Sequence, residues 1–258
     1  MFDATAKCPR FLPCRQSRSV AQHDDTTIAV NLPNALTIAR IAATPFVAAL
    51  PFLESSTWRG VGFVLFLAAA ITDHFDGAIA RKHGLITDLG RLLDPLADKL
   101  LLIGTFIPMF FLQHPVGDRV AAALPWAHPE ASSFAFETLA GPMFLPWWVL
   151  AIVLGREAFM TVFRQIANRR GTVIAAIGPA KWKAGFQFTW IGAAYCWIFV
   201  RTLASEQGWE GSAVWSATAQ IIGAIGAVTM IVAVVLTVWS LWLYLSRYGG
   251  LLLRAPAR

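Results

Sequence analysis

Six long apolar runs dominate the sequence and limit the folds that it can adopt. The runs are Ala35–Leu53, Gly60–Ala80, Leu96–Gln113, Leu145–Ala167, Lys183–Val200 and Ala219–Leu245. A helix needs about 20 apolar residues to cross the hydrocarbon core of a bilayer, and each run is close to that length. The chain is 57% hydrophobic and 14% charged, whereas about a quarter of the residues in a soluble domain are charged. The sequence therefore predicts an all-α integral membrane protein with six transmembrane helices.

The basic residues are distributed unevenly between the two sides of such a protein. The first, third and fifth loops hold only Arg59, Arg119 and Arg201, and the other eighteen of the 21 basic residues lie in the termini, the even-numbered loops and their flanking helix ends. Because cytoplasmic segments are enriched in Lys and Arg, we expect both termini to face the cytoplasm, in the inner (cytoplasmic) membrane of the cell. The net charge of +6 favours anionic lipid or phosphate partners. Nucleic acid is disfavoured, since no basic stripe is interleaved with aromatic residues.

One membrane domain accounts for most of the chain. It is expected to comprise residues 31–248, between a flexible basic tail of residues 1–30 and a short cytoplasmic tail of residues 249–258. The longest connection is Gln113–Phe144, whose His and acidic residues have no close ligand spacing, so it is predicted to be a solvated outer loop. Gly223 and Gly226 in the last apolar run are predicted to allow close packing of helices.

Four aspartates lie at the adjoining ends of the second and third apolar runs. Asp73 and Asp76 are three residues apart and Asp94 and Asp98 are four apart, so each pair lies on one face of a helix. The short linker Arg81–Leu89 lets the two helices return antiparallel, which brings the pairs together. Carboxylates at membrane depth repel one another and are costly to desolvate unless they share positive charge. Hard divalent cations with oxygen ligands, Mg²⁺ or Mn²⁺, would supply that charge.

Taken alone, the four aspartates are also compatible with three further roles. Each carboxylate could form an ordinary salt bridge with Arg81, Arg91 or Lys99, which are close in sequence. A divalent-cation transporter would also carry carboxylates within the membrane, although here all four lie toward one side and none lies in the middle of the other spans. A membrane scaffold without catalytic activity would need no such spacing.

The aspartates are part of a longer motif, which reads Asp73-x2-Asp76-Gly77-x2-Ala80-Arg81-x8-Gly90-x3-Asp94-x3-Asp98. At all eight positions it resembles the signature of the CDP-alcohol phosphatidyltransferases, and the resemblance covers roughly residues 31–245. It implies a membrane enzyme with two bound divalent cations, Mg²⁺ or Mn²⁺, and it suggests a homodimer. Asp73, Asp76 and Asp94 would be metal ligands, and Asp98 would be both a ligand and the catalytic general base.

The same resemblance implies a lipid donor, CDP-diacylglycerol. The residues that would bind it are Asp73, Asp76, Gly77, Ala80, Arg81, Thr87, Gly90, Asn34 and Thr37. Small residues within this set would let a planar base or a phosphate approach the backbone closely. The hydroxyl of an alcohol would attack the phosphorus that bears diacylglycerol, Asp98 would accept its proton, and CMP would leave.

A second stretch, Gly155–Gln187, is expected to select the alcohol. Arg156 and Arg164 lie in the cytoplasmic half of the fourth run, and Lys181 and Lys183 open the fifth. Basic residues on facing helices would form an anion site, although they could also serve as positive-inside anchors.

This stretch resembles the branch of the family that makes phosphatidylglycerophosphate. The matching residues are Arg156, Glu157, Arg164, Lys181, Lys183 and Gln187. The stretch departs from the branch at Ala180 and Ala184, where the branch has Gly and Thr. The resemblance implies glycerol 3-phosphate as the acceptor, bound through its phosphate by the four basic residues, with inositol phosphate or phosphatidylglycerol as alternatives.

Overall fold

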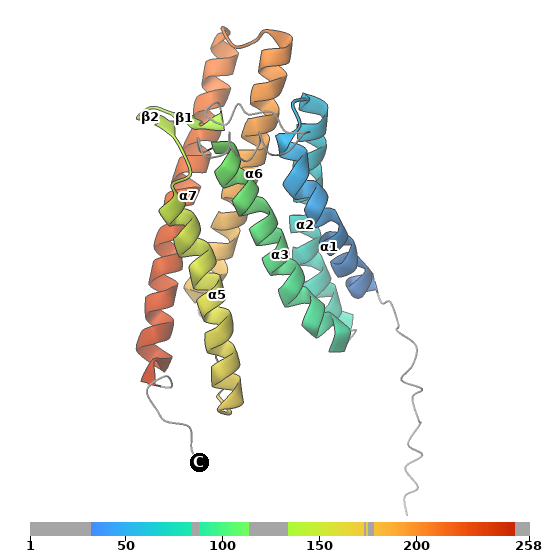
Figure 1. The fold of residues 1–258 in the computed structure, drawn as a ribbon, viewed down its shortest axis with the longest axis vertical. Helices are drawn as coiled ribbons and strands as arrows, with labels where there is room; N and C mark the ends of the chain where they lie inside the picture. The colour runs from blue at the N-terminus through green and yellow to red at the C-terminus, as the bar shows by residue number, and fades with distance from the viewer. Residues whose placement is uncertain (1–31, 84–87, 114–133, 173, 175–177, 251–258) are drawn as a thin grey trace, which may run out of the picture. The chain divides into compact units, whose positions relative to one another are not determined.

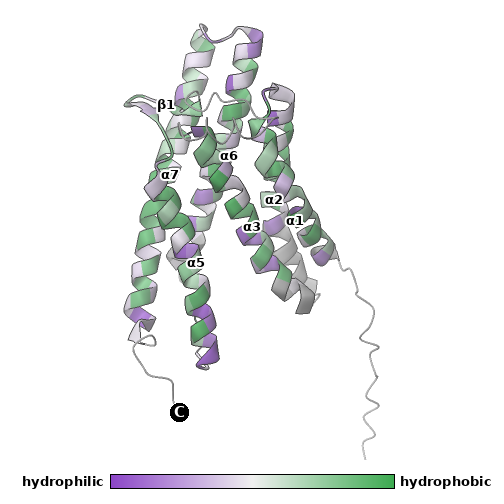
Figure 2. Cartoon of the chain, in the orientation of Figure 1, coloured by the Kyte–Doolittle hydropathy of each residue, from purple (hydrophilic) through white to green (hydrophobic). Residues whose placement is uncertain are grey.

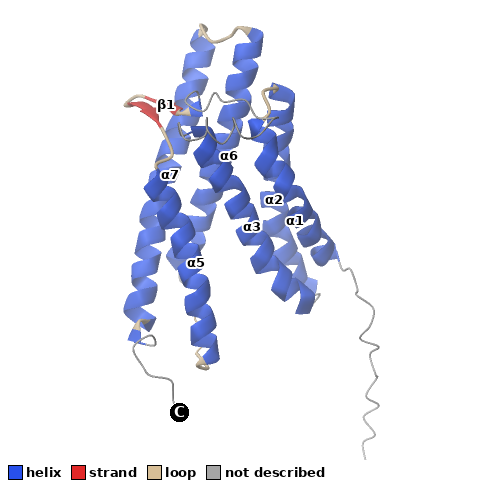
Figure 3. Ribbon diagram, in the orientation of Figure 1, coloured by secondary structure: helices blue, strands red, loops and turns tan. Residues whose placement is uncertain are grey.

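Each of the six apolar runs forms most of an α-helix in a computed structural model of the chain (Figure 1). The structure describes residues 32–83, 88–113, 134–172, 174 and 178–250. The helices are α1 (Leu32–Ala49), α2 (Ser56–His83), α3 (Asp88–Gln113), α5 (Trp147–Arg169), α6 (Gly178–Gln207) and α7 (Ala213–Tyr248). A short 3-10 turn, Leu50–Phe52, follows α1. Helix predominates in this part of the chain, as Figure 3 shows, so the all-α prediction is confirmed.

Three helical segments are long and apolar enough to cross a membrane, among the residues that the structure describes. They are Asn34–Phe52, Leu93–Gln113 and Ala213–Tyr248. Helices α2, α5 and α6 are 23 to 30 residues long but include several charged residues. Figure 2 shows hydrophilic residues gathered toward the same end of α3 and α5. These long apolar helices are consistent with an integral membrane protein, and α3 and α5 both present polar groups toward one end of the bundle.

Some of the predicted features lie outside the described residues. These are the tail of residues 1–30, residues 84–87 of the linker between α2 and α3, residues 114–133 of the longest connection, and residues 251–258 at the C-terminus.

Aromatic and small side chains fix the contacts between the first helices. Helix α1 packs against α2 and α3, and α2 packs against α6. The buried Tyr195 of α6 stacks on Phe66 of α2, with 5.2 Å between ring centroids, and its hydroxyl donates a 2.8 Å hydrogen bond to the carbonyl of Val47 in α1. Gly104 brings α3 against α1, because a Cβ atom there would lie 2.7 Å from Cγ2 of Thr44.

Part of the longest connection is buried, so the prediction of a solvated outer loop was wrong for that part. Strand β1 (Phe136–Thr138) pairs antiparallel with β2 (Gly141–Met143), and the hairpin packs against α7. The sequence Phe134-Ala135-Phe136 offers apolar surface that the bundle buries, and the Phe136 side chain is 1% exposed.

Gly223 and Gly226 of α7 provide the space for this hairpin. A Cβ atom at Gly223 would lie 1.9 Å from the carbonyl oxygen of Glu137, and one at Gly226 would lie 2.5 Å from the ring of Phe136. The two glycines therefore allow close packing, as predicted, but of a β-hairpin and not of another helix.

Replacing Gly223 with alanine is expected to destabilise the protein by about 2–3 kcal/mol, because the clash is with backbone and forces β1 away from α7. The measurement is thermal unfolding of the purified protein in detergent. Gly185→Ala in α6 is the matched control, since a Cβ atom there meets no atom within 4 Å, and it should leave the melting temperature unchanged or raise it. Equal melting temperatures for Gly223→Ala and the unsubstituted protein would contradict this packing.

A polar contact joins α2 to α6 at the end of the bundle opposite the aspartates. The carboxylate of Glu206 accepts hydrogen bonds from the backbone N–H of Ser56, at 2.8 Å, and from its hydroxyl. These bonds hold the pKa of the Glu206 carboxyl below its usual value. The buried Arg59 donates to Thr202 and to the carbonyl of Pro51 in the same region. These contacts connect the turn after α1 to the end of α6 and fix the relative positions of the helices.

Candidate functional site

A row of polar residues runs along the buried face of α1. The residues are Asn34, Thr37, Arg40 and Thr44, with exposures of 3%, 1%, 3% and 7%. Their spacing of three or four residues places them on one side of the helix. Polar side chains are buried within membrane helices at a cost unless they are hydrogen-bonded, so such a row marks a place where α1 contacts polar partners.

Two of these α1 residues contact two of the predicted metal ligands. The Thr37 hydroxyl donates a 2.8 Å hydrogen bond to Oδ1 of Asp94 in α3. Arg40 donates from Nη1 to Oδ1 of Asp73 in α2, at 2.5 Å, and from Nε to the carbonyl oxygen of Ala69, at 3.2 Å. Helix α1 thus orients carboxylates from both neighbouring helices, which the sequence did not predict.

The third described aspartate, Asp98, lies one helical turn beyond Asp94 in α3. Asp94 and Asp98 are both exposed, and the side chain of Asp73 is 34% exposed. All three therefore offer carboxylate oxygens outside the packed interior of the bundle.

Several predicted donor-site residues have a known place in the chain but no described side chain. Asp76, Gly77, Ala80 and Arg81 lie in the last turns of α2, and Thr87 lies outside the described residues altogether. Among the side chains that the structure does describe, no three His, Cys, Asp or Glu residues lie close enough to hold a metal ion. The fourth aspartate is missing from that set, so the predicted metal centre stays a prediction.

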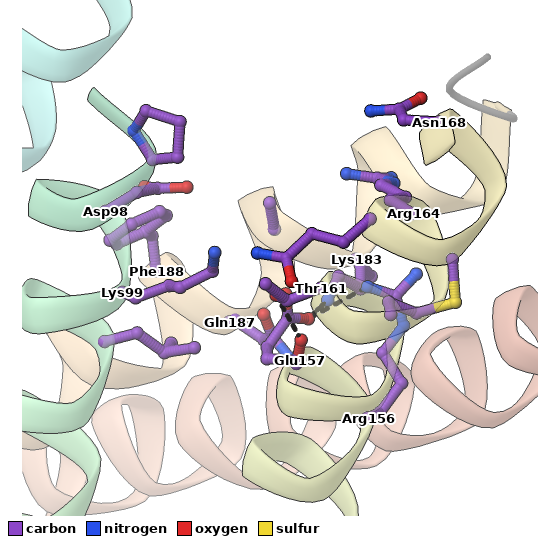
Figure 4. Close-up of a pocket in the computed structure, with 15 residues that line it drawn as sticks. Asp98, Lys99, Arg156, Glu157, Thr161, Arg164, Asn168, Lys183, Gln187 and Phe188 are labelled. Carbon is purple, nitrogen blue, oxygen red and sulfur yellow. Dashed lines mark hydrogen bonds and ion pairs between the residues drawn. The ribbon is translucent and has the colours of Figure 1, made fainter. Parts of the chain in front are cut away.

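A polar pocket of about 470 Å³ lies between α3, α5 and α6. Its lining residues are Pro95, Asp98, Lys99, Leu102, Arg156, Glu157, Met160, Thr161, Arg164, Gln165, Asn168, Lys183, Ala184, Gln187 and Phe188. Figure 4 shows Asp98 and Lys99 on one side, facing residues of α5 and α6. The pocket joins the predicted catalytic base to three of the four predicted acceptor-binding residues. The fourth, Lys181, lies in the first turn of α6, and its side chain is not described.

Two buried cations share one carboxylate in this pocket. Arg156 and Lys183 are 4% and 5% exposed, and both contact Oε1 of Glu157, with Nη1 of Arg156 at 3.0 Å. Nη2 of Arg156 donates to Oγ of Ser240 in α7, at 3.2 Å, whereas its Nε–H has no hydrogen-bond partner in the described part of the chain. Buried cationic donors that are not fully hydrogen-bonded favour binding of an anion.

Helix α7 supports the pocket from behind. The guanidinium groups of Arg156 and Arg164 lie 5.9 Å and 5.8 Å from the ring centroid of the buried Tyr244, at cation–π distance. Gln187 donates a 3.3 Å hydrogen bond to the hydroxyl of Thr237. The aromatic ring and the hydroxyl limit the movement of side chains that line the pocket.

The formal charge of the pocket is suited to a phosphate monoester. Among the described side chains that line it, four are basic, namely Lys99, Arg156, Arg164 and Lys183, and two are acidic, Asp98 and Glu157. The excess of two positive charges matches a phosphate monoester, which carries about −1.5 to −2 near neutral pH.

Sequence reasoning missed three groups that hold the pocket together. Glu157 was predicted only as a residue that matches the family branch, without a role in the site, and Ser240 and Tyr244 had no assigned role. The last two are more than 80 residues from Arg156 along the chain and lie on a helix whose pattern is apolar, so only the packing of α7 against α5 reveals them.

Comparisons with known proteins are consistent with this architecture. The family model for CDP-alcohol phosphatidyltransferases matches residues 30–244. A CDP-diacylglycerol–glycerol-3-phosphate 3-phosphatidyltransferase of Rickettsia bellii is 50% identical over 88 residues, which are 34% of this chain and 48% of the relative. The chain thus spans about half the length of this relative.

Longer matches are found at lower identity. A probable phosphatidylglycerophosphate synthase of Mycobacterium tuberculosis is 34% identical over 176 residues, 67% of each chain. A chloroplastic and mitochondrial CDP-diacylglycerol–glycerol-3-phosphate 3-phosphatidyltransferase of Arabidopsis thaliana is 30% identical over 231 residues, which are 87% of this chain and 65% of the relative. The matched region of the family model contains α1 to α6 and most of α7, with the aspartates and the pocket. The chain therefore belongs to the CDP-alcohol phosphatidyltransferase family.

Proposed function

We propose that the protein transfers the phosphatidyl group of CDP-diacylglycerol to sn-glycerol 3-phosphate, forming phosphatidylglycerophosphate and releasing CMP. The observation that carries this proposal is the pocket in which Asp98 of α3 faces Arg156, Arg164 and Lys183. A single acceptor can place its phosphate on the cations and its hydroxyl at the carboxylate. The names of the Rickettsia bellii and Arabidopsis thaliana relatives contain the same two substrates, and the name of the Mycobacterium tuberculosis relative contains the same product.

The acceptor is held by its charge and activated by Asp98. Guanidinium and ammonium groups form short, charge-assisted hydrogen bonds to phosphate oxygens, and their burial strengthens this attraction. Asp98 then accepts the proton of the primary hydroxyl as its oxygen attacks the phosphorus of the donor. Inositol phosphate and phosphatidylglycerol also combine a phosphate with hydroxyls, but both are larger than glycerol 3-phosphate.

In this proposal, the pyrophosphate of the donor binds at the ends of α2 and α3 that are predicted to be cytoplasmic. An apolar groove of about 430 Å³ lies between α2, α6 and α7, and Ala70 at its edge is one helical turn from Asp73. Acyl chains of the donor can lie along this groove while its pyrophosphate lies among the aspartates. In the proposed topology all six helices span the inner membrane, both termini face the cytoplasm, and the site opens toward the cytoplasm.

Two divalent cations, Mg²⁺ or Mn²⁺, are proposed to be held by Asp73, Asp76, Asp94 and Asp98. These side chains fit such cations, because carboxylate oxygens are the ligands that hard cations prefer. Arg40 and Thr37 orient Asp73 and Asp94, as groups behind metal ligands commonly do. Bound cations would supply positive charge to the pyrophosphate and to the departing CMP.

The proposed function is tested by CMP release from CDP-diacylglycerol with a panel of acceptors. Purified protein with Mg²⁺ or Mn²⁺ should release CMP when glycerol 3-phosphate is added, and at least about tenfold more slowly with inositol phosphate or phosphatidylglycerol. Excess EDTA should abolish release, and added divalent cation should restore it. The proposal is refuted if no acceptor stimulates CMP release, and the choice of acceptor is refuted if inositol phosphate or phosphatidylglycerol is the better substrate.

A further inference from the structure

An acidic residue in a pocket for a phosphate needs a physical reason. Glu157 lies among the cations of α5 and α6, where a carboxylate repels the anion that the same cations would bind. Besides Asp98, the proposed base, it is the only acidic residue among the described residues that line this pocket. A pocket adapted to phosphate alone would gain affinity by having a neutral residue there.

The two oxygens of Glu157 have different surroundings. Oε1 contacts both Arg156 and Lys183, whereas Oε2 has no hydrogen-bond or ion-pair partner among the described residues. The side chain is 24% exposed. An ionised carboxylate only accepts hydrogen bonds and has about four lone-pair positions, so Oε2 can accept a hydrogen bond from a ligand.

The position of Glu157 in the pocket determines which group of a bound substrate its Oε2 atom can contact. Glu157 lines the same pocket as Asp98 and Arg164, and in Figure 4 it lies lower in the view than both. Glycerol 3-phosphate has a hydroxyl on its middle carbon, between the phosphate and the primary hydroxyl that reacts. Because Glu157 contacts both Arg156 and Lys183, a phosphate bound to these cations brings the adjoining middle carbon and its hydroxyl close to Glu157.

We propose that Oε2 of Glu157 accepts a hydrogen bond from the acceptor hydroxyl that does not react, and so selects phosphates of vicinal diols. This inference rests on the proposed function. Lys183 and Arg156 have enough N–H groups to bind Oε1 of Glu157 and phosphate oxygens together. Glu157 thus sets the position of both cations through one oxygen and recognises the substrate through the other.

The consequence is discrimination against acceptors without the middle hydroxyl. Such an acceptor leaves Oε2 desolvated and without a donor, which is costly for a charged group. If the middle carbon carries a carbonyl, its oxygen and Oε2 of Glu157 are both hydrogen-bond acceptors, so they repel each other. Hydrogen bonds to charged groups correspond to a selectivity of about 10- to 100-fold in kcat/KM.

The test compares glycerol 3-phosphate with 3-hydroxypropyl phosphate, which keeps the phosphate and the primary hydroxyl but lacks the middle one. CMP release by the unsubstituted protein should show kcat/KM about 10- to 100-fold higher for glycerol 3-phosphate. Dihydroxyacetone phosphate should be at least as poor as the deoxy acceptor. Glu157→Met, which removes the carboxylate oxygens, should reduce the ratio of kcat/KM for glycerol 3-phosphate to kcat/KM for 3-hydroxypropyl phosphate to below about threefold. Glu157→Gln keeps a neutral acceptor and should give an intermediate ratio.

Thr161→Val is the matched control. Thr161 lines the same pocket one turn after Glu157 and donates its hydroxyl hydrogen to the Glu157 backbone carbonyl, so its loss should leave the ratio unchanged. Equal kcat/KM for glycerol 3-phosphate and 3-hydroxypropyl phosphate in the unsubstituted protein overturns the inference. A Glu157→Met variant that keeps the whole preference for glycerol 3-phosphate overturns it as well. Both outcomes differ from failure of the proposed function, in which glycerol 3-phosphate releases no CMP at all.

Discussion

Replacing Asp98 with asparagine is expected to lower kcat by about 10²- to 10⁴-fold, the range of a lost general base. Asp98 is exposed, lies one turn beyond Asp94 on α3, and lines the pocket that contains the cations. Asparagine keeps the size of the side chain but cannot accept a proton from the attacking hydroxyl. Steady-state CMP release measures the effect, and binding of CDP-diacylglycerol, followed by calorimetry, should be retained.

The control for this variant is Glu210→Gln, which exchanges a carboxylate for an amide in the exposed turn between α6 and α7. It should have the activity of the unsubstituted protein. Full activity of Asp98→Asn would remove Asp98 as the base. Loss of donor binding equal to the loss of turnover would assign Asp98 to the binding of metal and donor alone.

Replacing Lys183 with alanine should raise the KM for glycerol 3-phosphate by about 30-fold or more, with a much smaller change in the KM for CDP-diacylglycerol. The Lys183 side chain is buried and contacts Glu157. Its removal costs a charge-assisted bond to phosphate and also leaves Glu157 with less positive charge beside the anion. The measurement is initial velocity with each substrate varied in turn.

Lys99→Ala is a useful comparison, because Lys99 lines the same pocket but is less buried. Its effect on the KM for glycerol 3-phosphate should be smaller, and Lys183→Arg, which keeps the charge, should lie between the alanine variant and the unsubstituted protein. A larger change in the KM for CDP-diacylglycerol than for glycerol 3-phosphate would contradict the role of Lys183.

The sequence predicted the helices well because the apolar runs are long and continuous. All six runs are helical in the described part of the chain, and most boundaries differ from the expected ones by the polar turns that extend the helices. The spacing of Asp94 and Asp98 also placed them correctly on one face of α3. Periodicity within one helix is local information that a single sequence contains.

Contacts between distant segments could not be predicted in this way. Thr37 and Asp94 are 57 residues apart, and Arg40 and Asp73 are 33 apart. Their hydrogen bonds depend on how α1 packs against α2 and α3, which no local pattern specifies. The hairpin beside Gly223 escaped prediction for the same reason, since a loop that is rich in alanine and proline has no clear strand pattern.

One pocket is proposed to direct both the phosphate and the hydroxyl of a single acceptor to the lipid donor. The most direct measurement is mass spectrometry of the lipid made by the purified protein, in nanodiscs, from CDP-diacylglycerol and deuterated glycerol 3-phosphate. We expect deuterated phosphatidylglycerophosphate in a one-to-one ratio with CMP. Release of CMP without a deuterated lipid would contradict it.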